Sequence, residues 1–380
     1  MRRLLLLVSA IVAADTTFFT ALTPLLPRFA DRFGLSKAEA GVLVATYAAG
    51  ALFGAMPGGV AASRWGPKQG VLVGLTLMTA SSVAFALAGD VWTLGVARFL
   101  QGFGSVFSWA GGLAWLIGST PRERRGELLG TAMGAAVFGA LLGPVLGALG
   151  GVVGVRAAFL IVSAIGLALI AWAASTPGAA AEAQPLREGL RALRGSQLYA
   201  GGWLIILPAF LFGVLVVLVP LRLHRDGWGA IGIGAVFLAT TALEVVLNPL
   251  LGRFTDRRGR LQPVRAALLG SIVVSVGLAW ATEPLAIVPL VLAAGIAYGA
   301  FYTPGLALIS EGAERQGVAQ ALAFGVMNAG WAIGAIIGPA LGGGLAAIAG
   351  DAVPYLLMAA VCLATYVIAR ARVLEPVPLS

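Results

Sequence analysis

The sequence predicts an all-α membrane protein with twelve transmembrane helices, arranged as two pseudo-symmetric six-helix halves around a central cavity. Three observations lead to this fold class. Only 11% of the 380 residues are charged and 59% are hydrophobic, whereas a soluble domain carries about 25% charged residues. Apolar stretches of roughly 20 residues, the length that crosses a bilayer, recur along the whole chain. Two different motifs also repeat at nearly the same spacing.

The expected spans follow from these apolar stretches. They lie near residues 4–27, 38–62, 69–89, 91–118, 127–150, 154–174, 199–221, 229–252, 263–281, 284–309, 317–346 and 352–370. The first stretch resembles a secretory signal in its opening residues, but it continues past Asp15 to about Pro27, and we expect a retained helix. The single cysteine, Cys362, falls inside an apolar stretch, where we expect a small core residue.

The distribution of basic residues predicts the orientation. Of the 25 Lys and Arg residues, 18 fall in one alternating set of loops and six in the other, and Arg98 lies inside a span. Loops rich in Lys and Arg face the cytoplasm. We therefore expect both termini in the cytoplasm of a cell with a plasma or inner membrane, and the net charge of +9 reflects topology rather than nucleic-acid binding.

A polar segment divides the chain. Residues 176–198 contain Pro177, Gly178 and Pro185, together with arginines at helical spacing. We expect a cytoplasmic linker that carries a short amphipathic helix at the membrane surface. The predicted domains are an N-terminal six-helix half at 1–175, the linker at 176–198, and a C-terminal six-helix half at 199–380.

Two patterns indicate that the halves are copies. The sequence from Gly59 to Lys68 follows the second span, and a similar one that begins at Gly252 follows the eighth, 193 positions later. A Gly-Pro pair stands at Gly143 in the fifth span and again at Gly338 in the eleventh, 195 positions later. Parallel six-helix repeats are a known plan of transporters, with the binding site between the halves.

These patterns resemble the signatures of the major facilitator superfamily, and the resemblance covers nearly the whole chain. Residues 252–260 resemble the loop signature between the second and third helices and its copy between the eighth and ninth. Residues 98–104 resemble the fourth-helix signature. Residues 139–147 resemble the fifth-helix signature that is associated with antiporters, notably the drug:proton group.

The resemblance implies a set of gating residues. They are Gly59, Ser63, Arg64, Gly143, Pro144, Gly252, Asp256, Arg257, Gly259, Arg260, Gly338 and Pro339. In the family the loop motif latches the two halves on the cytoplasmic side. Ser63 stands where the family pattern has an acid, and because Ser forms no ion pair, the first-half latch is expected to be weaker. The glycines also allow close helix packing, and each proline removes one intrahelical hydrogen bond.

Three charged residues lie inside apolar spans and have no copy in the other half: Asp15, Arg98 and Glu244. A charge within the bilayer is costly and is retained where it has a partner or faces water. We expect Asp15 and Glu244 to carry the coupled proton and Arg98 to modulate one of them, through an Asp15–Arg98 pair that the first and fourth helices would bring together. Purely structural roles, such as a helix-helix hydrogen bond or an outward-pointing Arg98, are the alternatives.

Polar and aromatic residues indicate the wall of the cavity. The candidates are Phe19, Gln101, Trp109, Asn248, Tyr298, Tyr302, Asn328 and Trp331. Tyr298 and Tyr302 are spaced to share one face of the tenth span, and Asn328 and Trp331 one face of the eleventh. A largely aromatic wall favours apolar or amphipathic solutes. His224, the only histidine, is expected in a solvated outer loop.

The sequence favours transport over catalysis. It contains no cluster of metal ligands, no catalytic Ser/His/Asp set and no nucleotide-binding domain. We expect no enzyme activity, no metal and no cofactor besides the proton as coupling ion. The partners would be a small-molecule substrate and the lipid bilayer, and we expect a monomer that binds no nucleic acid.

The predicted function is a proton-coupled exporter of small amphipathic or hydrophobic compounds that works by alternating access. A proton symporter that imports a sugar, organic acid or other metabolite is the alternative within transport, and a non-transporting membrane sensor or scaffold is the alternative of another class.

Overall fold

A computed structural model of the protein describes residues 2–120, 125–178, 196–258, 261–316 and 320–374. Within these ranges, the side chains of residues 63, 125–127, 129, 196, 248–258, 261, 320–324, 326 and 371–374 are not described. The N-terminal helices are α1 (Arg2–Thr20), η1 (Thr23–Leu25), α2 (Leu26–Phe33), α3 (Lys37–Arg64), α4 (Pro67–Leu87), α5 (Val91–Gly118), α6 (Arg125–Val153) and α7 (Val155–Ser175). The C-terminal helices are α9 (Ser196–Arg225), α10 (Ala230–Arg258), α11 (Leu261–Trp280), α12 (Pro284–Gly299), α13 (Tyr302–Arg315), α14 (Gln320–Ala349) and α15 (Ala352–Leu374).

The chain is an all-helical membrane protein. Eleven stretches of the described residues are long and apolar enough to cross a membrane. The expected span at 91–118 is not among them, although α5 covers the same 28 residues. Arg98 and Gln101 lower the mean hydropathy of this helix, and both side chains are buried inside the protein. At about 1.5 Å per residue, α5 is nevertheless long enough to span the hydrocarbon core of a bilayer.

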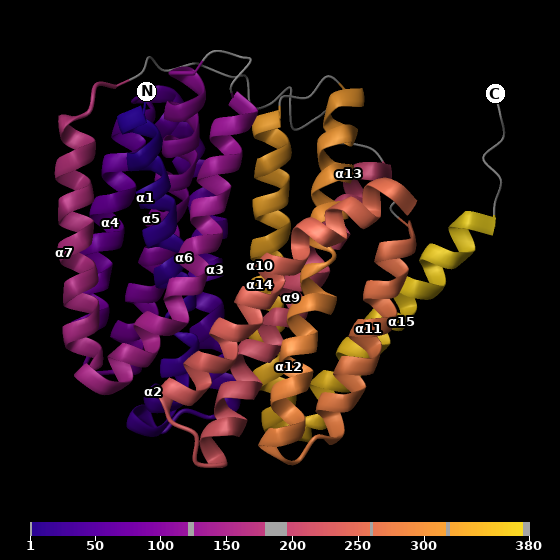
Figure 1. Ribbon diagram of the computed structural model, residues 1–380. Helices are drawn as coiled ribbons and strands as arrows, with labels where there is room; N and C mark the ends of the chain where they lie inside the picture. Colours follow the sequence, from indigo (N-terminus) through magenta and orange to yellow (C-terminus); the bar gives the residue numbers. More distant parts are fainter. Residues whose placement is uncertain (1, 121–124, 179–195, 259–260, 317–319, 375–380) are drawn as a thin grey trace.

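The helices lie in two groups beside each other. Figure 1 shows α1–α7 on one side of the bundle and most of α9–α15 on the other. We call these the N-terminal group and the C-terminal group. We also call the face of the bundle where α1 begins the terminus face, and the face that carries Asp31, Asp90 and Asp351 the opposite face.

Two of the expected spans are broken rather than continuous. The first apolar segment stops being α-helical at Thr20, continues through η1, and resumes as α2, which ends at Phe33 rather than near 27. Pro24 and Pro27 explain this break, because proline lacks a backbone N–H and cannot continue the ladder of hydrogen bonds. The tenth segment is divided into α12 and α13 at Ala300 and Phe301. Pro304, just after this break, again lacks the N–H that a continuous helix would use.

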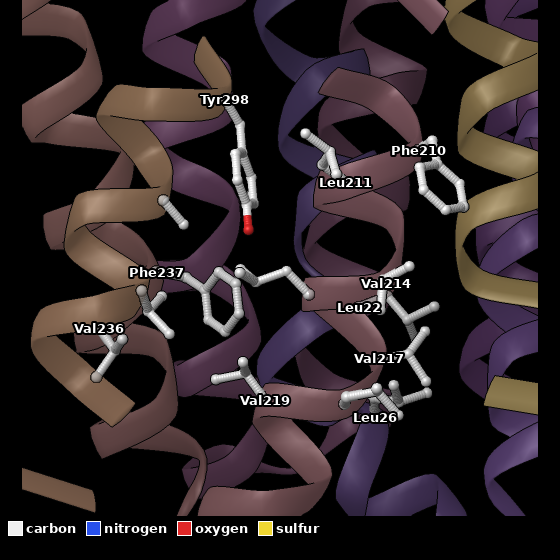
Figure 2. Packing of buried hydrophobic residues seen from close by; sticks show 14 of the residues in the cluster. Leu22, Leu26, Phe210, Leu211, Val214, Val217, Val219, Val236, Phe237 and Tyr298 are labelled. Carbon is white, nitrogen blue, oxygen red and sulfur yellow. The ribbon is translucent and has the colours of Figure 1, made fainter. Parts of the chain in front are cut away.

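One hydrophobic core joins both groups near the opposite face. Leu22 and Leu26 from the first segment belong to the same buried cluster as Val214 of α9, Phe237 of α10 and Tyr298 of α12. Figure 2 shows these side chains around α9. Because lipid is as apolar as this core, tight packing rather than the exclusion of water holds such helices together.

Glycines let the two groups approach closely at the crossing of α3 and α14. A Cβ atom placed on Gly41 would lie 2.2 Å from the carbonyl oxygen of Pro339, and one on Gly343 would lie 2.3 Å from the carbonyl oxygen of Lys37. Gly338 meets the carbonyl oxygen of Phe210 in the same way. Two of the predicted gating residues, Gly338 and Pro339, therefore lie in a tight backbone contact.

Ionic contacts also join the groups on the opposite face. Asp351, in the loop after α14, accepts hydrogen bonds from Lys37 of α3 and from Arg225 of α9, the latter at 2.8 Å. His224 Nε2 lies 2.7 Å from Asp31 Oδ2 of α2. The expectation of a solvated loop for His224 was wrong, because α9 extends to Arg225 and brings its last turn against the N-terminal group.

The remaining gating candidates are described only in part. Gly59 has open space around it, and Arg64 is exposed at the end of α3. Gly252, Asp256 and Arg257 lie in α10 and Ser63 in α3, but their side chains are outside the described residues. Gly259 and Arg260, and the expected amphipathic helix of the linker, are outside them altogether.

Replacing Gly102 by Ala should destabilise the fold. A Cβ atom at this position of α5 would lie 1.9 Å from the carbonyl oxygen of Tyr47 in α3. We expect the free energy of unfolding to fall by about 1–3 kcal/mol, the usual cost of overpacking. Thermal unfolding in detergent would measure this. Gly95→Ala in the same helix is the matched control, since nothing lies within 4 Å of its Cβ position. Equal stability of the two variants would contradict the close crossing of α3 and α5.

The contact made by Asp351 should persist across the physiological pH range. Burial alone would disfavour its charge, but the hydrogen bonds from Lys37 and Arg225 outweigh burial and hold the pKa of Asp351 below its ordinary value of 3.8. A lowered acid pKa stabilises the contact above that value, and the stabilisation is lost as the pH falls through the pKa of the folded protein. The thermal stability that the protein gains over Asp351→Asn in detergent should therefore be unchanged from pH 8 to pH 5 and should shrink below about pH 4. A loss of the contact near neutral pH would refute this assignment.

Candidate functional site

The candidate site is centred on Asp15 in the middle of α1. Its side chain is only 3% exposed. Tyr47 of α3 donates to Asp15 Oδ1 at 2.8 Å, while Ser105 and Trp109 of α5 donate to Oδ2 at 2.9 Å and 2.5 Å. Three neutral donors from two helices therefore hold one buried carboxylate, as a charged group in an apolar interior requires.

One face of α5 supplies most of this site. Arg98, Gln101, Ser105 and Trp109 follow one another at intervals of three or four residues, so they lie along a single side of the helix. Asp90 begins the helix by accepting from the backbone N–H of Thr93 at 2.8 Å, which fixes where the helix starts and hence which side chains face α1.

Arg98 is anchored at the break in α1. Its guanidinium donates to the carbonyl oxygens of Phe18 at 2.9 Å and Phe19 at 2.5 Å, and to Gln101 Oε1 at 3.2 Å. The last carbonyls of a helix lack intrahelical partners and carry partial negative charge. Arg98 thus satisfies the C-terminal end of α1, and Gln101 is held in turn by a 3.1 Å bond to Ser82.

The predicted pairing of Asp15 with Arg98 was wrong in its direct form. In the described part of the chain each side chain bonds to neutral groups rather than to the other. The two charges still act on each other through space. The prediction failed because sequence spacing does not show that α1 ends at Thr20 and offers its own carbonyls to Arg98.

Threonines of α1 and glycines of α6 hold these two helices close together. The hydroxyl oxygens of three threonines of α1 lie 2.9, 3.0 and 3.4 Å from carbonyl oxygens of α6, in the pairs Thr16–Ala136, Thr17–Gly139 and Thr20–Ala140. Each hydroxyl shares its one hydrogen between that carbonyl and a carbonyl of α1 itself. Pro144 has no N–H to offer Ala140, four residues earlier, so Thr20 occupies an acceptor that the proline leaves open. Gly143 makes room, because a Cβ there would lie 1.8 Å from Thr20 Oγ1.

Aromatic rings connect the site to the C-terminal group. The ring of Tyr47 lies 4.9 Å from that of Phe19, and Phe19 meets Trp331 of α14 edge to face at 5.2 Å. The guanidinium of Arg98 lies over the Tyr47 ring at 4.8 Å and near the Phe19 ring at 5.9 Å. Three of the predicted functional residues, Phe19, Arg98 and Trp331, are therefore brought together.

Glu244 lies elsewhere, against the break in the tenth segment. A Cβ atom on Gly299 would be 2.7 Å from Glu244 Oε1. The absence of a side chain on this glycine therefore leaves room for the Glu244 carboxylate at the end of α12. Tyr302, at the start of α13, is near enough for the charge of Glu244 to act on it. Tyr298 was expected to share a face with Tyr302; the break falls between them, and the two side chains join different buried clusters. Tyr298 is fully buried, bonded to Ser275 at 3.1 Å and packed on Phe212.

The other cavity candidates fall into different environments. Gln101 is fully buried and binds Arg98, and its place in the cavity wall stays a prediction. Trp109, Phe19 and Trp331 are half-buried, and Asn328 is exposed. The side chain of Asn248 is outside the described residues. In the part of the chain that the structure describes, no three His, Cys, Asp or Glu side chains cluster to hold a metal ion.

Sequence reasoning missed two residues of the site, Tyr47 and Ser105. Tyr47 is 2% exposed and Ser105 is 5% exposed. Ser105 could have been found from its spacing to Gln101 and Trp109 on the same helix face. Tyr47 gave only a weak signal, because a tyrosine in an apolar span is equally common at helix contacts that have no charged partner.

Comparisons with known proteins agree with this architecture. The family model described as Major Facilitator Superfamily matches residues 5–324. The chain is 25% identical over 340 residues to Multidrug resistance protein 2 of Bacillus subtilis, a match that covers 84% of this chain and 83% of that protein. It is 33% identical over 172 residues to Probable vesicular acetylcholine transporter-B of Danio rerio, covering 42% of this chain and 34% of the relative. The chain thus spans only about a third of the length of that relative.

A solved structure shows the same fold. The crystal structure of a bacterial homologue of the human lysosomal transporter Spinster, in an inward-facing and unoccupied conformation, superposes with a TM-score of 0.79 at 15% identity. The superposition covers 97% of this chain and 95% of the other. The family match over most of the chain shows that the protein belongs to the Major Facilitator Superfamily of membrane transporters and is not an enzyme.

Proposed function

We propose that the protein is a proton-coupled exporter of small amphipathic or hydrophobic compounds, which works by alternating access between its N-terminal and C-terminal groups. In this proposal the groups correspond to six-helix halves at 1–175 and 199–380 with a cytoplasmic linker between them, and α5 is the twelfth span. Both termini lie in the cytoplasm, so the protein sits in a plasma or inner membrane as a monomer.

The observation that carries the proposal is the site of Asp15. A carboxylate that is 3% exposed and bound by three neutral donors can gain or lose a proton without breaking an ion pair. The negative charge of Asp15 nevertheless interacts electrostatically with the positive charge of Arg98. A helix movement that changes these contacts changes the proton affinity of the carboxylate, which is what coupling requires. Glu244, seated at the break between α12 and α13, is the second proposed proton carrier.

The contacts between the groups support alternating access. The tight crossing of α3 and α14 and the ionic contacts of Asp351 join the groups on the opposite face. With the termini in the cytoplasm, this arrangement closes the outer side. For that side to open, these contacts and the part of the hydrophobic core that joins the two groups near it would have to separate.

Export of amphipathic compounds is supported by two observations. Phe19, Trp109 and Trp331 bring aromatic surface next to Asp15 and Arg98, which suits solutes that combine a ring with a polar group. The relative matched over the greatest share of both chains among those described above is named for multidrug resistance. This likeness favours export over the uptake of a sugar or organic acid.

Proton movement in inside-out vesicles tests the proposal. An imposed pH gradient is followed while hydrophobic cationic dyes, antibiotics, sugars and organic acids are added in turn. We expect proton release on addition of a hydrophobic compound, and its loss in Asp15→Asn, because the asparagine side chain carries no exchangeable acid proton. Glu244→Gln should reduce the release if this residue carries part of the coupled charge.

The controls separate coupling from folding. Each variant must retain the thermal stability of the parent protein, and exchange of labelled substrate without a gradient must continue in Asp15→Asn. Proton release that persists in the Asp15→Asn, Glu244→Gln double variant would refute the proton assignment. Coupling to a sugar or an organic acid alone would replace export by uptake, and silence across the whole panel would favour a sensor or scaffold.

A further inference from the structure

Tyr47 is the residue of the Asp15 site that makes two kinds of contact at once. Its hydroxyl donates to Asp15 Oδ1 at 2.8 Å, and its ring packs on Phe19 at 4.9 Å and under Arg98 at 4.8 Å. The side chain is 2% exposed, so any movement of the ring must displace a neighbour. Ser105 and Trp109 also bind Asp15, but they lie on α5 and have no ring contact with Phe19 among the described residues.

The ring contact continues into the C-terminal group. Phe19 follows Asp15 by one turn of α1 and touches Trp331 of α14 edge to face at 5.2 Å. An unbroken series of contacts therefore leads from the carboxylate of Asp15 through Tyr47 and Phe19 to the helix that packs against α3 across the two groups.

Protonation of Asp15 must act unequally on its three donors. Oδ2 accepts from Trp109 as well as Ser105, and an indole N–H can only donate, so a proton on Oδ2 would have to displace the bond from Ser105 and leave one lone pair for the Trp109 N–H. Oδ1 accepts only from Tyr47, whose hydroxyl can turn round and accept. The proton therefore enters most easily at Oδ1. It comes from water and forms one O–H bond, and the Tyr47 hydroxyl must then redirect its own hydrogen or move away.

The charged and titratable groups that act on Asp15 are few. They are Tyr47 from α3 and Arg98 from α5. The helices α6 and α7 also pack against α1. In the described part of the chain, α6 presents backbone carbonyls and glycines near Asp15, and α7 shares apolar clusters with α1 through Val162 and Leu169.

We propose that Tyr47 is a positioning residue that transmits the protonation state of Asp15 to the contact between the two groups. When Asp15 is charged, the Tyr47 hydroxyl holds the ring against Phe19, and Phe19 stays on Trp331. When Oδ1 is protonated, the Tyr47 hydroxyl can no longer donate to it, and in this proposal the ring shifts away from Phe19 instead of only turning its hydroxyl. The inference rests on the proposed role of Asp15 as a proton carrier, and it adds the residue through which the two groups respond.

The experiment measures the distance between the groups as a function of pH, so it needs no known substrate. Spin labels are attached through Gly89→Cys and Glu283→Cys, two exposed loop positions on the opposite face, in a Cys362→Ala background. The full chain is held in lipid nanodiscs, and the distance distribution is recorded from pH 5 to pH 8. The parent should change its distribution with pH, and Asp15→Asn should lose the part of this response that depends on Asp15.

Tyr47→Phe should then change two properties. The pH at which the distance change is half complete (the midpoint) should rise by about one to two pH units, because the charged form of the carboxylate loses one hydrogen bond. The amplitude should also fall to the level of Phe19→Leu, since the ring no longer follows the carboxylate. Ser105→Ala is the matched control: it removes a donor but no ring contact, so it should move the midpoint in the same direction and keep the amplitude. Tyr199→Phe, at an exposed tyrosine, should change neither.

Each outcome decides the inference. Two results would show that Tyr47 does not transmit the protonation state while leaving the proposed function intact. In the first, the pH response of Tyr47→Phe has the same amplitude as that of Ser105→Ala. In the second, the distance in the parent does not respond to pH although its flux depends on Asp15. If Asp15→Asn keeps both flux coupling and pH response, the proposed function itself fails. Phe19→Leu, which leaves the hydrogen bonds of Asp15 in place, should lower the amplitude without moving the midpoint, and this tests the ring path even if Tyr47→Phe folds poorly.

Discussion

Two opposite charges buried in an apolar bundle constrain the rest of this structure. Each must be satisfied inside the protein, because an unpaired charge in hydrocarbon costs several kcal/mol. Asp15 takes its hydrogen bonds from three neutral side chains, and Arg98 gives its own to backbone carbonyls and Gln101. Since neither charge neutralises the other directly, the carboxylate can change its protonation state while Arg98 keeps its anchors.

The breaks that prolines cause in two spans are subject to the same constraint. Non-helical backbone is tolerated at membrane depth only where protein or water satisfies it. The end of α1 exposes carbonyls that Arg98 occupies, and the break between α12 and α13 lies where Gly299 receives the side chain of Glu244. Both acids proposed as proton carriers are thus close to a discontinuity in a helix, where a small shift of backbone changes their surroundings.

Small residues decide how closely the helices pack around these sites. Gly102 lets α5 touch the backbone of α3 beside Tyr47, and Gly143 lets α6 receive Thr20 of α1. Gly41 and Gly343 allow the N-terminal and C-terminal groups to meet at α3 and α14. Contacts of this kind fit closely but contain no large side chain, so the crossing of α3 and α14 itself can open without displacing one.

The sequence by itself determined the class of the protein, the places of most of its apolar segments, and the rarity of Asp15, Arg98 and Glu244, because hydropathy and uncopied charges are properties of composition and order. The tertiary structure alone decided the partners of those charges. Tyr47 lies 32 residues and Ser105 90 residues from Asp15, and only the crossing of α1, α3 and α5 brings them together. It also decided that Arg98 binds carbonyls and that Tyr298 and Tyr302 are divided, because both outcomes depend on where a helix ends, which prolines and neighbouring helices set jointly.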